Sequence, residues 1–161
     1  MFKKSILILF PALVFLFACN NGKQEMVNQK DEAPTFDSLL AGQLEADDYG
    51  MSKYFLAYLK AGPNRTQDSL TAARLQREHL DNITRMAEEG TLVLAGPFLD
   101  DGDVRGIYIF NVPTMEDAQK IAESDPAVKA GRLILEIHPW YGSAALKQVN
   151  EVHKRIGRKG I

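Results

Sequence analysis

The order in which apolar runs and helical segments alternate between residues 54 and 137 is the feature that most restricts the fold. Apolar runs at 54–59, 91–95, 106–112 and 132–137 have the length and composition of strands. Segments 69–89 and 115–123 separate them, with apolar residues at helical spacing. The resulting order, βαββαβ, predicts a ferredoxin-like α+β fold: a four-stranded antiparallel sheet with both helices on one face.

Residues that end or begin regular structure stand where this order needs them. Gly62 and Pro63 follow the first predicted strand, and Gly90 follows the first predicted helix as a C-terminal cap. The residues at 100–103 have the composition of a hairpin turn. Thr114 can cap the second helix, which begins with acidic residues.

Two of the predicted strands are apolar on both faces. In the run 106–112, Ile107 and Ile109 alternate with Tyr108 and Phe110, and the run 54–59 repeats this pattern. A sheet with helices on one side and water on the other would alternate apolar and polar residues instead. We therefore expect the second face to be covered. A second copy of the sheet, giving a homodimer, is the simplest cover, and the chain's own C-terminal segment is the alternative.

The first 18 residues have the composition of a secretory signal. Two lysines precede a run of uncharged, mostly apolar residues at 5–18, which is shorter than a membrane-spanning helix requires. The residues at 16–19 resemble the bacterial lipobox, which ends in an obligatory cysteine. That resemblance implies lipid attachment to Cys19 and anchoring to a membrane of the bacterial cell envelope, facing the periplasm or the exterior. A plain signal with an incidental cysteine is the alternative.

Composition divides the rest of the chain into three parts. Residues 19–51 are acidic, with few large apolar side chains, and are expected to form a flexible tether. Residues 52–142 form the predicted domain. Residues 143–161 are basic, and their apolar residues recur at helical spacing. Such a helix could contact an anionic membrane surface or pack on its own domain with its basic residues solvated.

Several classes of function lack support in the sequence. The net charge of −2 offers no field that would gather nucleic acid. The three histidines, at 79, 138 and 153, lack metal-ligand spacing, so no metal site is predicted. Gly96 and Pro97 stand without the other glycines of a phosphate-binding loop, and we expect no cofactor.

His79 and Asp125 are the candidates for acid–base chemistry. His79 lies on the flank of the first helix's apolar face, and an unperturbed imidazole titrates near neutral pH. Asp125 precedes Pro126 and can cap a one-turn helix that ends at Gly131. The same carboxylate could orient an imidazole. Each residue also has a purely structural interpretation, and sequence spacing does not decide whether the two meet.

Fragments spread over residues 52–142 resemble the YCII-related domain family, part of the dimeric α+β barrel group. They are Glu78-His79-Leu80, Ala95-Gly96-Pro97, Gly106, Asp125-Pro126 and Ala130-Gly131. The resemblance implies a paired histidine and aspartate beside a pocket at the sheet, here His79 and Asp125, and dimerisation through the sheet. Related barrels include isomerases and dehydrochlorinases.

The substrate-binding residues that we expect at this pocket are Gly96, Pro97, Tyr58 and Tyr108. The sequence thus favours a membrane-anchored domain that binds a small organic molecule, with acid–base chemistry of the isomerase or lyase type that uses no cofactor. The alternative is a non-catalytic dimeric module for ligand binding or protein interaction.

Overall fold

The computed structural model describes residues 35–160. Every element discussed below belongs to one compact unit that begins at Phe36. The predicted signal at 1–18 and the candidate lipid-attachment residue Cys19 lie outside the described residues. Within residues 35–160, no helix has both the length and the apolar character needed to cross a membrane.

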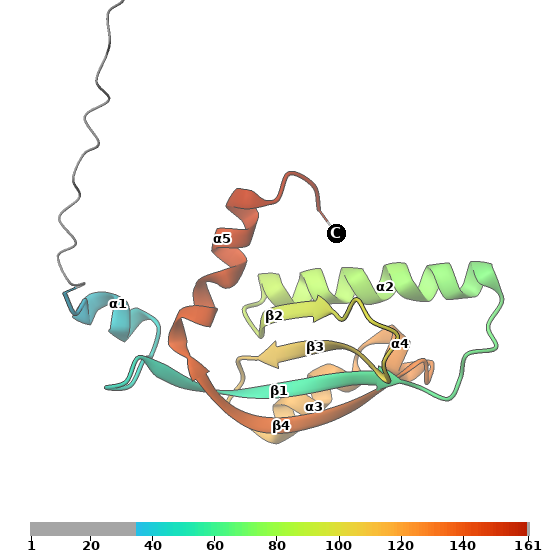
Figure 1. The fold of residues 1–161 in the computed structure, drawn as a ribbon, viewed down its shortest axis with the longest axis horizontal. Helices are drawn as coiled ribbons and strands as arrows, with labels where there is room; N and C mark the ends of the chain where they lie inside the picture. The colour runs from blue at the N-terminus through green and yellow to red at the C-terminus, as the bar shows by residue number, and fades with distance from the viewer. Residues whose placement is uncertain (1–34, 161) are drawn as a thin grey trace, which may run out of the picture. The chain divides into compact units, whose positions relative to one another are not determined.

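Four antiparallel strands form one sheet in the order β2-β3-β1-β4 (Figure 1). The strands are β1 (Met51–Ala61), β2 (Leu92–Pro97), β3 (Val104–Phe110) and β4 (Leu133–Ser143). Helix α2 (Ser69–Glu88) connects β1 to β2, and α3 (Met115–Glu123) follows β3. The predicted ferredoxin-like α+β fold is confirmed.

Local capping chemistry sets the helix boundaries. The Asp68 carboxylate accepts the backbone N–H of Thr71 at the start of α2, and Gly90 just beyond its end has φ +73°, a conformation that favours glycine. The Thr114 hydroxyl accepts the backbone N–H of Asp117 at the start of α3. The structure thus gives α3 the bounds expected from the sequence.

The main core lies between the helices and one face of the sheet. Alternate residues of β1 and β3 point into it and meet small residues of α3 and larger ones of α2. Its buried members are Ala57, Leu59, Met86, Leu92, Tyr108, Phe110, Ala118 and Ala122. The alanines let α3 approach the strands closely, while Met86 fills the space beneath α2.

The C-terminal segment covers part of the second sheet face. The short 3₁₀ helix η1 (Ala144–Gln148) places Leu146 against a second cluster formed by Tyr54, Val93 and Ile109. Helix α5 (Val149–Ile156) follows, and the Asn150 side chain donates to the Leu92 carbonyl at 2.8 Å. The chain's own segment is therefore a cover for this end of the face.

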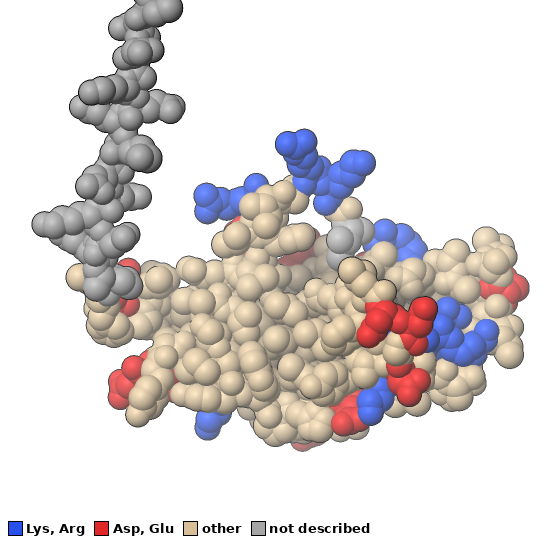
Figure 2. All heavy atoms as spheres, in the orientation of Figure 1, with Lys and Arg blue, Asp and Glu red and all other residues tan. Residues whose placement is uncertain are grey.

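The remainder of that face carries exposed apolar side chains. Tyr58 and Trp140 are 36% exposed and Ile134 is 49% exposed. Figure 2 shows a broad uncharged area over the strands on this side, with charged side chains gathered around its edges. We call the area formed by Tyr58, Ile134 and Trp140 the open face.

Strand β4 runs well beyond its predicted end at residue 137. It continues to Ser143 and pairs with β1 throughout, with Pro139 opposite Phe55. Proline has no N–H to donate, so it ends an interior strand, but β4 is an edge strand and only one of its sides is bonded. The strand can therefore include Pro139.

The segment before β1 differs from the expected flexible tether in its last part. Helix α1 (Ser38–Gln43) forms there, capped by the Asp37 carboxylate. After it, Glu45 makes an ion pair with Lys147, and Asp47 accepts a hydrogen bond from the Tyr141 hydroxyl. Residues 36–50 are thus attached to the domain, because their acidic side chains find partners on β4 and η1.

Candidate functional site

Helix α2 positions His79 at the border between the core and a cavity. His79 lies one helical turn before Ile83, which packs against the main core. Its side chain is 12% exposed. The imidazole is therefore largely shielded from bulk water.

Asp125 is fully buried and has three hydrogen-bond partners. As the N-cap of α4 (Pro126–Lys129), it accepts the backbone N–H of Ala127 on Oδ1 at 2.8 Å. Its Oδ2 lies 2.9 Å from His79 Nδ1 and accepts the Asn82 side-chain N–H at 3.1 Å. The carboxylate that caps α4 is thus also the one that contacts His79.

The surroundings of Asp125 favour its charged form. Burial pushes the pKa of this carboxyl upward, but the hydrogen bond and charge of His79, with the N–H groups of Asn82 and Ala127, outweigh burial and lower the pKa below its usual value. Since an ionised carboxylate only accepts hydrogen bonds, His79 Nδ1 carries the proton between them. The basic atom left on a neutral imidazole is Nε2.

Tyr108 on β3 lies beside the imidazole. The two rings are nearly parallel, with 24° between their planes and 6.2 Å between centroids, and the hydroxyl is 3.5 Å from His79 Nε2. Burial and the negative charge of Asp125 raise the pKa of Tyr108 well above its usual value. The phenol therefore keeps its proton at neutral pH and is available as a hydrogen-bond donor.

A cavity of about 570 Å³ adjoins these residues. It lies where β1 and β2 end and β3 and β4 begin, with mainly apolar walls. The residues that line it are Leu59, Arg65, Gln76, His79, Leu80, Ile83, Ala95, Gly96, Pro97, Arg105, Gly106, Tyr108, Ala127, Arg132 and Leu133. This volume lies in the range of small-molecule sites.

Gly106 gives the cavity a backbone wall. A Cβ at this position would come within 2.6 Å of the Gly96 carbonyl oxygen, so no larger residue fits without moving the strands. Both glycines line the cavity. Polypeptide backbone, without side chains, therefore forms this part of the lining.

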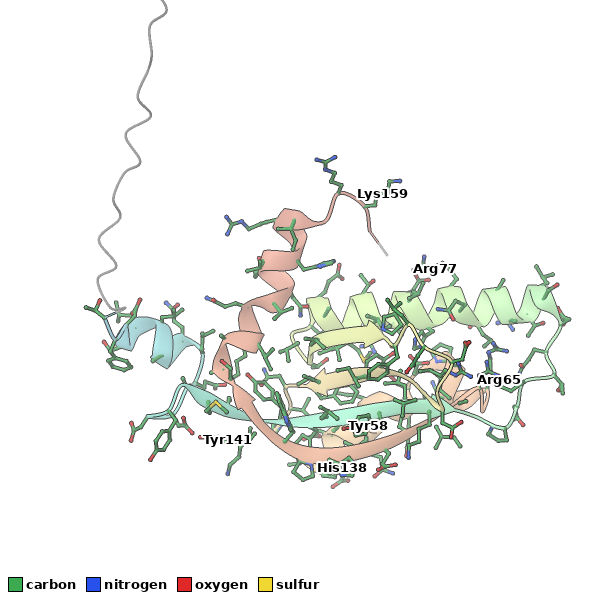
Figure 3. All side chains as sticks on the ribbon, in the orientation of Figure 1. Tyr58, Arg65, Arg77, His138, Tyr141 and Lys159 are labelled. Atoms are coloured by element: carbon green, nitrogen blue, oxygen red, sulfur yellow. The ribbon has the colours of Figure 1, made fainter. Side chains whose placement is uncertain are left out.

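Most of the predicted site residues lie together. His79, Gly96, Pro97 and Tyr108 line the cavity, and Asp125 stands behind His79. Tyr58 does not join them. It lies on the open face, where its ring meets His138 edge to face (Figure 3), because successive side chains of a strand point to opposite faces and Ala57 and Leu59 occupy the core side.

Four residues at this site were not predicted from the sequence. Asn82 donates a hydrogen bond to Asp125. Because it follows His79 by three residues on the same helix, its place on the same helix face could have been predicted. Arg65, Arg105 and Arg132 line the cavity. They come from three separate segments, so no local pattern groups them. Among residues 35–160, no three His, Cys, Asp or Glu residues are placed to hold a metal ion.

Three comparisons place the chain among known proteins. A search of curated proteins found no match. Among solved structures, the chain is similar to 5-chloro-2-hydroxyhydroquinone dehydrochlorinase from Burkholderia phenoliruptrix AC1100, determined in complex with 2,5-dihydroxybenzoquinone. The identity is 24% and the TM-score 0.42, over 54% of this chain and 92% of that one. The model of the YCII-related domain matches residues 54–141, which is more than half of the chain. This protein therefore belongs to the YCII-related domain family.

Proposed function

We propose that the cavity binds a small organic molecule and that His79 moves a proton within it, with Asp125 as the positioning residue. One observation carries the proposal: His79 lines the cavity on one side and is hydrogen-bonded to a buried, ionised carboxylate on the other. A base held in one tautomer by a second group is the arrangement of general acid–base sites.

The chemistry that this arrangement favours is removal of a proton from a carbon next to a carbonyl group. Nε2 of neutral His79 accepts the proton, and Asp125 stabilises the imidazolium that forms. Returning the proton to another carbon completes an isomerisation, and departure of a leaving group completes an elimination. Tyr108, which keeps its own proton, can donate a hydrogen bond to the oxygen on which negative charge develops.

Hydrogen–deuterium exchange tests this function without knowledge of the natural substrate. A panel of cyclic enones and enol lactones is incubated with the protein in D₂O, and loss of C–H signals is followed by proton NMR. The wild-type protein should accelerate exchange in at least one compound, and His79→Gln should slow it by about 10²- to 10⁴-fold. His138→Gln, which alters a histidine on the open face, is the matched control and should exchange at the wild-type rate.

The second candidate is a non-catalytic binding module. It is favoured by the structural role of Asp125, which caps α4 whether or not chemistry takes place. Compounds that raise the melting temperature, but whose exchange is the same in wild type and His79→Gln, would support this candidate and contradict the proton-transfer function.

We also propose that Cys19 carries the lipid anchor and holds the protein at the cell envelope. The support is the sequence alone: a basic start, a short apolar run and a cysteine at its end. Wild-type protein should partition into the membrane fraction and Cys19→Ser into the soluble fraction. Membrane partitioning of Cys19→Ser would contradict the anchor.

The open face supports a further proposal, a homodimer formed through the sheet. Leu146 covers one end of this face, while Tyr58, Ile134 and Trp140 remain partly exposed. Exposed apolar side chains on a sheet face are typical of an association surface, and here the polar side chains of Glu136 and His138 lie between Ile134 and Trp140 on β4. Sedimentation equilibrium measures the oligomeric state, and the variant that tests the surface is described in the Discussion.

A further inference from the structure

We propose that the ligand of the cavity is an organic oxyanion whose charged group is bound by Arg65, Arg105 and Arg132. The inference rests on the proposed binding function and adds the chemical class of the ligand. It starts from the placement of these arginines, which are the cationic residues that line the cavity.

The arginines of the cavity differ from those of the exposed helix surface in their partners. On α2, Arg74 pairs with Glu78 and Arg85 pairs with Glu89, each four residues further along. Within residues 35–160, none of the three cavity arginines makes an ion pair with a carboxylate. Positive charge is therefore left uncompensated beside mainly apolar walls.

The hydrogen bonds of these arginines go to neutral groups only. Arg132 donates to the Gln67 side-chain oxygen at 2.7 Å, and Arg65 donates to the Arg132 carbonyl at 3.4 Å. The buried Nε of Arg105 has no hydrogen-bond partner within the described part of the chain. Buried donors in folded proteins are nearly always satisfied, so the Arg105 guanidinium retains hydrogen-bonding capacity that the described side chains and backbone do not use.

Two glycines hold the segments that carry Arg65 and Arg132 against each other. The Gly62 N–H donates to the Arg132 carbonyl at 2.8 Å, and the Asn64 N–H donates to the Gly131 carbonyl at 3.1 Å. A Cβ on Gly62 would lie 2.2 Å from the Gly131 oxygen, and Gly131 itself has φ +68°. These contacts bring two like charges to one end of the cavity, an arrangement that an anion would stabilise.

Guanidinium groups bind carboxylate and phosphate oxygens through paired, charge-assisted hydrogen bonds. The apolar walls, including Leu59, Ile83 and Leu133, suit an organic body. The ligand class is therefore a small organic molecule with a carboxylate or phosphate at the arginine end and its reacting carbon near His79.

Binding of matched probes tests the class directly. Benzoate, phenyl phosphate and neutral benzamide share a ring and differ in the charged group, and inorganic phosphate lacks the ring. Titrations followed by ¹⁵N-edited NMR of the full domain should give at least about tenfold tighter binding of one of the two charged aromatic probes than of benzamide. Preference for benzoate or for phenyl phosphate identifies the charged group, and inorganic phosphate alone should bind more weakly than the preferred probe.

Substitution of the arginines should remove this preference. Arg105→Gln is expected to weaken binding of the preferred probe by about tenfold to a hundredfold and to leave benzamide unchanged. If Arg105→Gln folds poorly, Arg65→Gln, at an exposed residue, provides a second test. Arg74→Gln alters an exposed, ion-paired arginine outside the cavity and should leave all affinities unchanged.

Different results would contradict the anion site and the proton-transfer function. Equal affinity for benzamide and both charged probes, or a preference that survives Arg105→Gln and Arg65→Gln, would overturn the anion site. A preference that depends on these arginines upholds the site even when no compound shows exchange that depends on His79.

Discussion

Asp125 uses its two carboxylate oxygens for different purposes. Oδ1 caps α4 through Ala127, and Oδ2 binds His79 and Asn82. A buried charge is tolerated only when hydrogen bonds replace its lost hydration, and these three partners supply them. The residue therefore links a local structural role to the candidate site.

The lowered pKa of Asp125 predicts how its stabilising effect depends on pH. Since the pKa of Asp125 is lower in the folded state than in the unfolded chain, its contribution is complete above the unfolded value of about 4 and is lost as pH falls through the folded value. Asp125→Asn keeps an equally good cap but cannot ionise. It should lower the free energy of unfolding by about 1–3 kcal/mol at pH 7, and by less near pH 3.

Urea unfolding of both proteins between pH 3 and pH 7 measures this difference. Asp68→Asn, an exposed N-cap whose pKa is also lowered, is the matched control and should show a smaller dependence. A stability difference between wild type and Asp125→Asn that stays constant over the whole range would contradict the prediction.

Residue type indicated His79 and Asp125 as candidates, but only the resemblance to a known family implied that the two are paired. They are 46 positions apart, and the sheet that brings α2 and α4 together is not visible in local spacing. Asn82 was detectable in principle, because it follows His79 by one helical turn. The three cavity arginines were not, since the packing of distant loops brings them together.

The elements of the fold were largely predictable, because caps and turn residues mark their ends. Thr114 fixes α3, and Asp125 with Gly131 brackets the one-turn helix α4 as expected. The exception is β4, where Pro139 predicted an end that an edge strand does not require. Whether a strand lies at an edge depends on sheet order, which is not a local property.

Dimerisation through the open face can be tested with a single substitution. Ile134 is 49% exposed and lies near the start of β4, so Ile134→Asp should have little effect on the fold but place charge against the same surface of a second copy. We expect the dissociation constant in sedimentation equilibrium to rise by at least about tenfold. Leu99→Asp, at a fully exposed leucine in the β2–β3 turn, is the matched control and should leave the dissociation constant unchanged.

A wild-type protein that sediments as a monomer at all concentrations would contradict the sheet-face dimer. Equal association of wild type and Ile134→Asp would place any dimer on another surface.

At the scale of the whole molecule, doubly apolar strands predicted cover on both sheet faces, and the structure shows it for one end of the second face. The strands could not show which segment covers which part of the second face. Leu146 of η1 takes one end of the second face, a contact between residues distant in sequence. The position of Tyr58 was also not predictable. The sequence does not say which face of the strand borders the cavity, and Tyr58 lies on the other face, against His138.

The cavity and the two chain-end segments occupy opposite ends of the sheet. Ala61 pairs with the cavity residue Leu133 at one end, while Met51 pairs with Ser143 at the other end, where the segment before β1 and the segment after β4 both depart. A dye, a surface or a fused domain joined before residue 36 is thus attached away from the cavity. Protein immobilised through a group joined before residue 36 should therefore keep its binding site open for ligand screening.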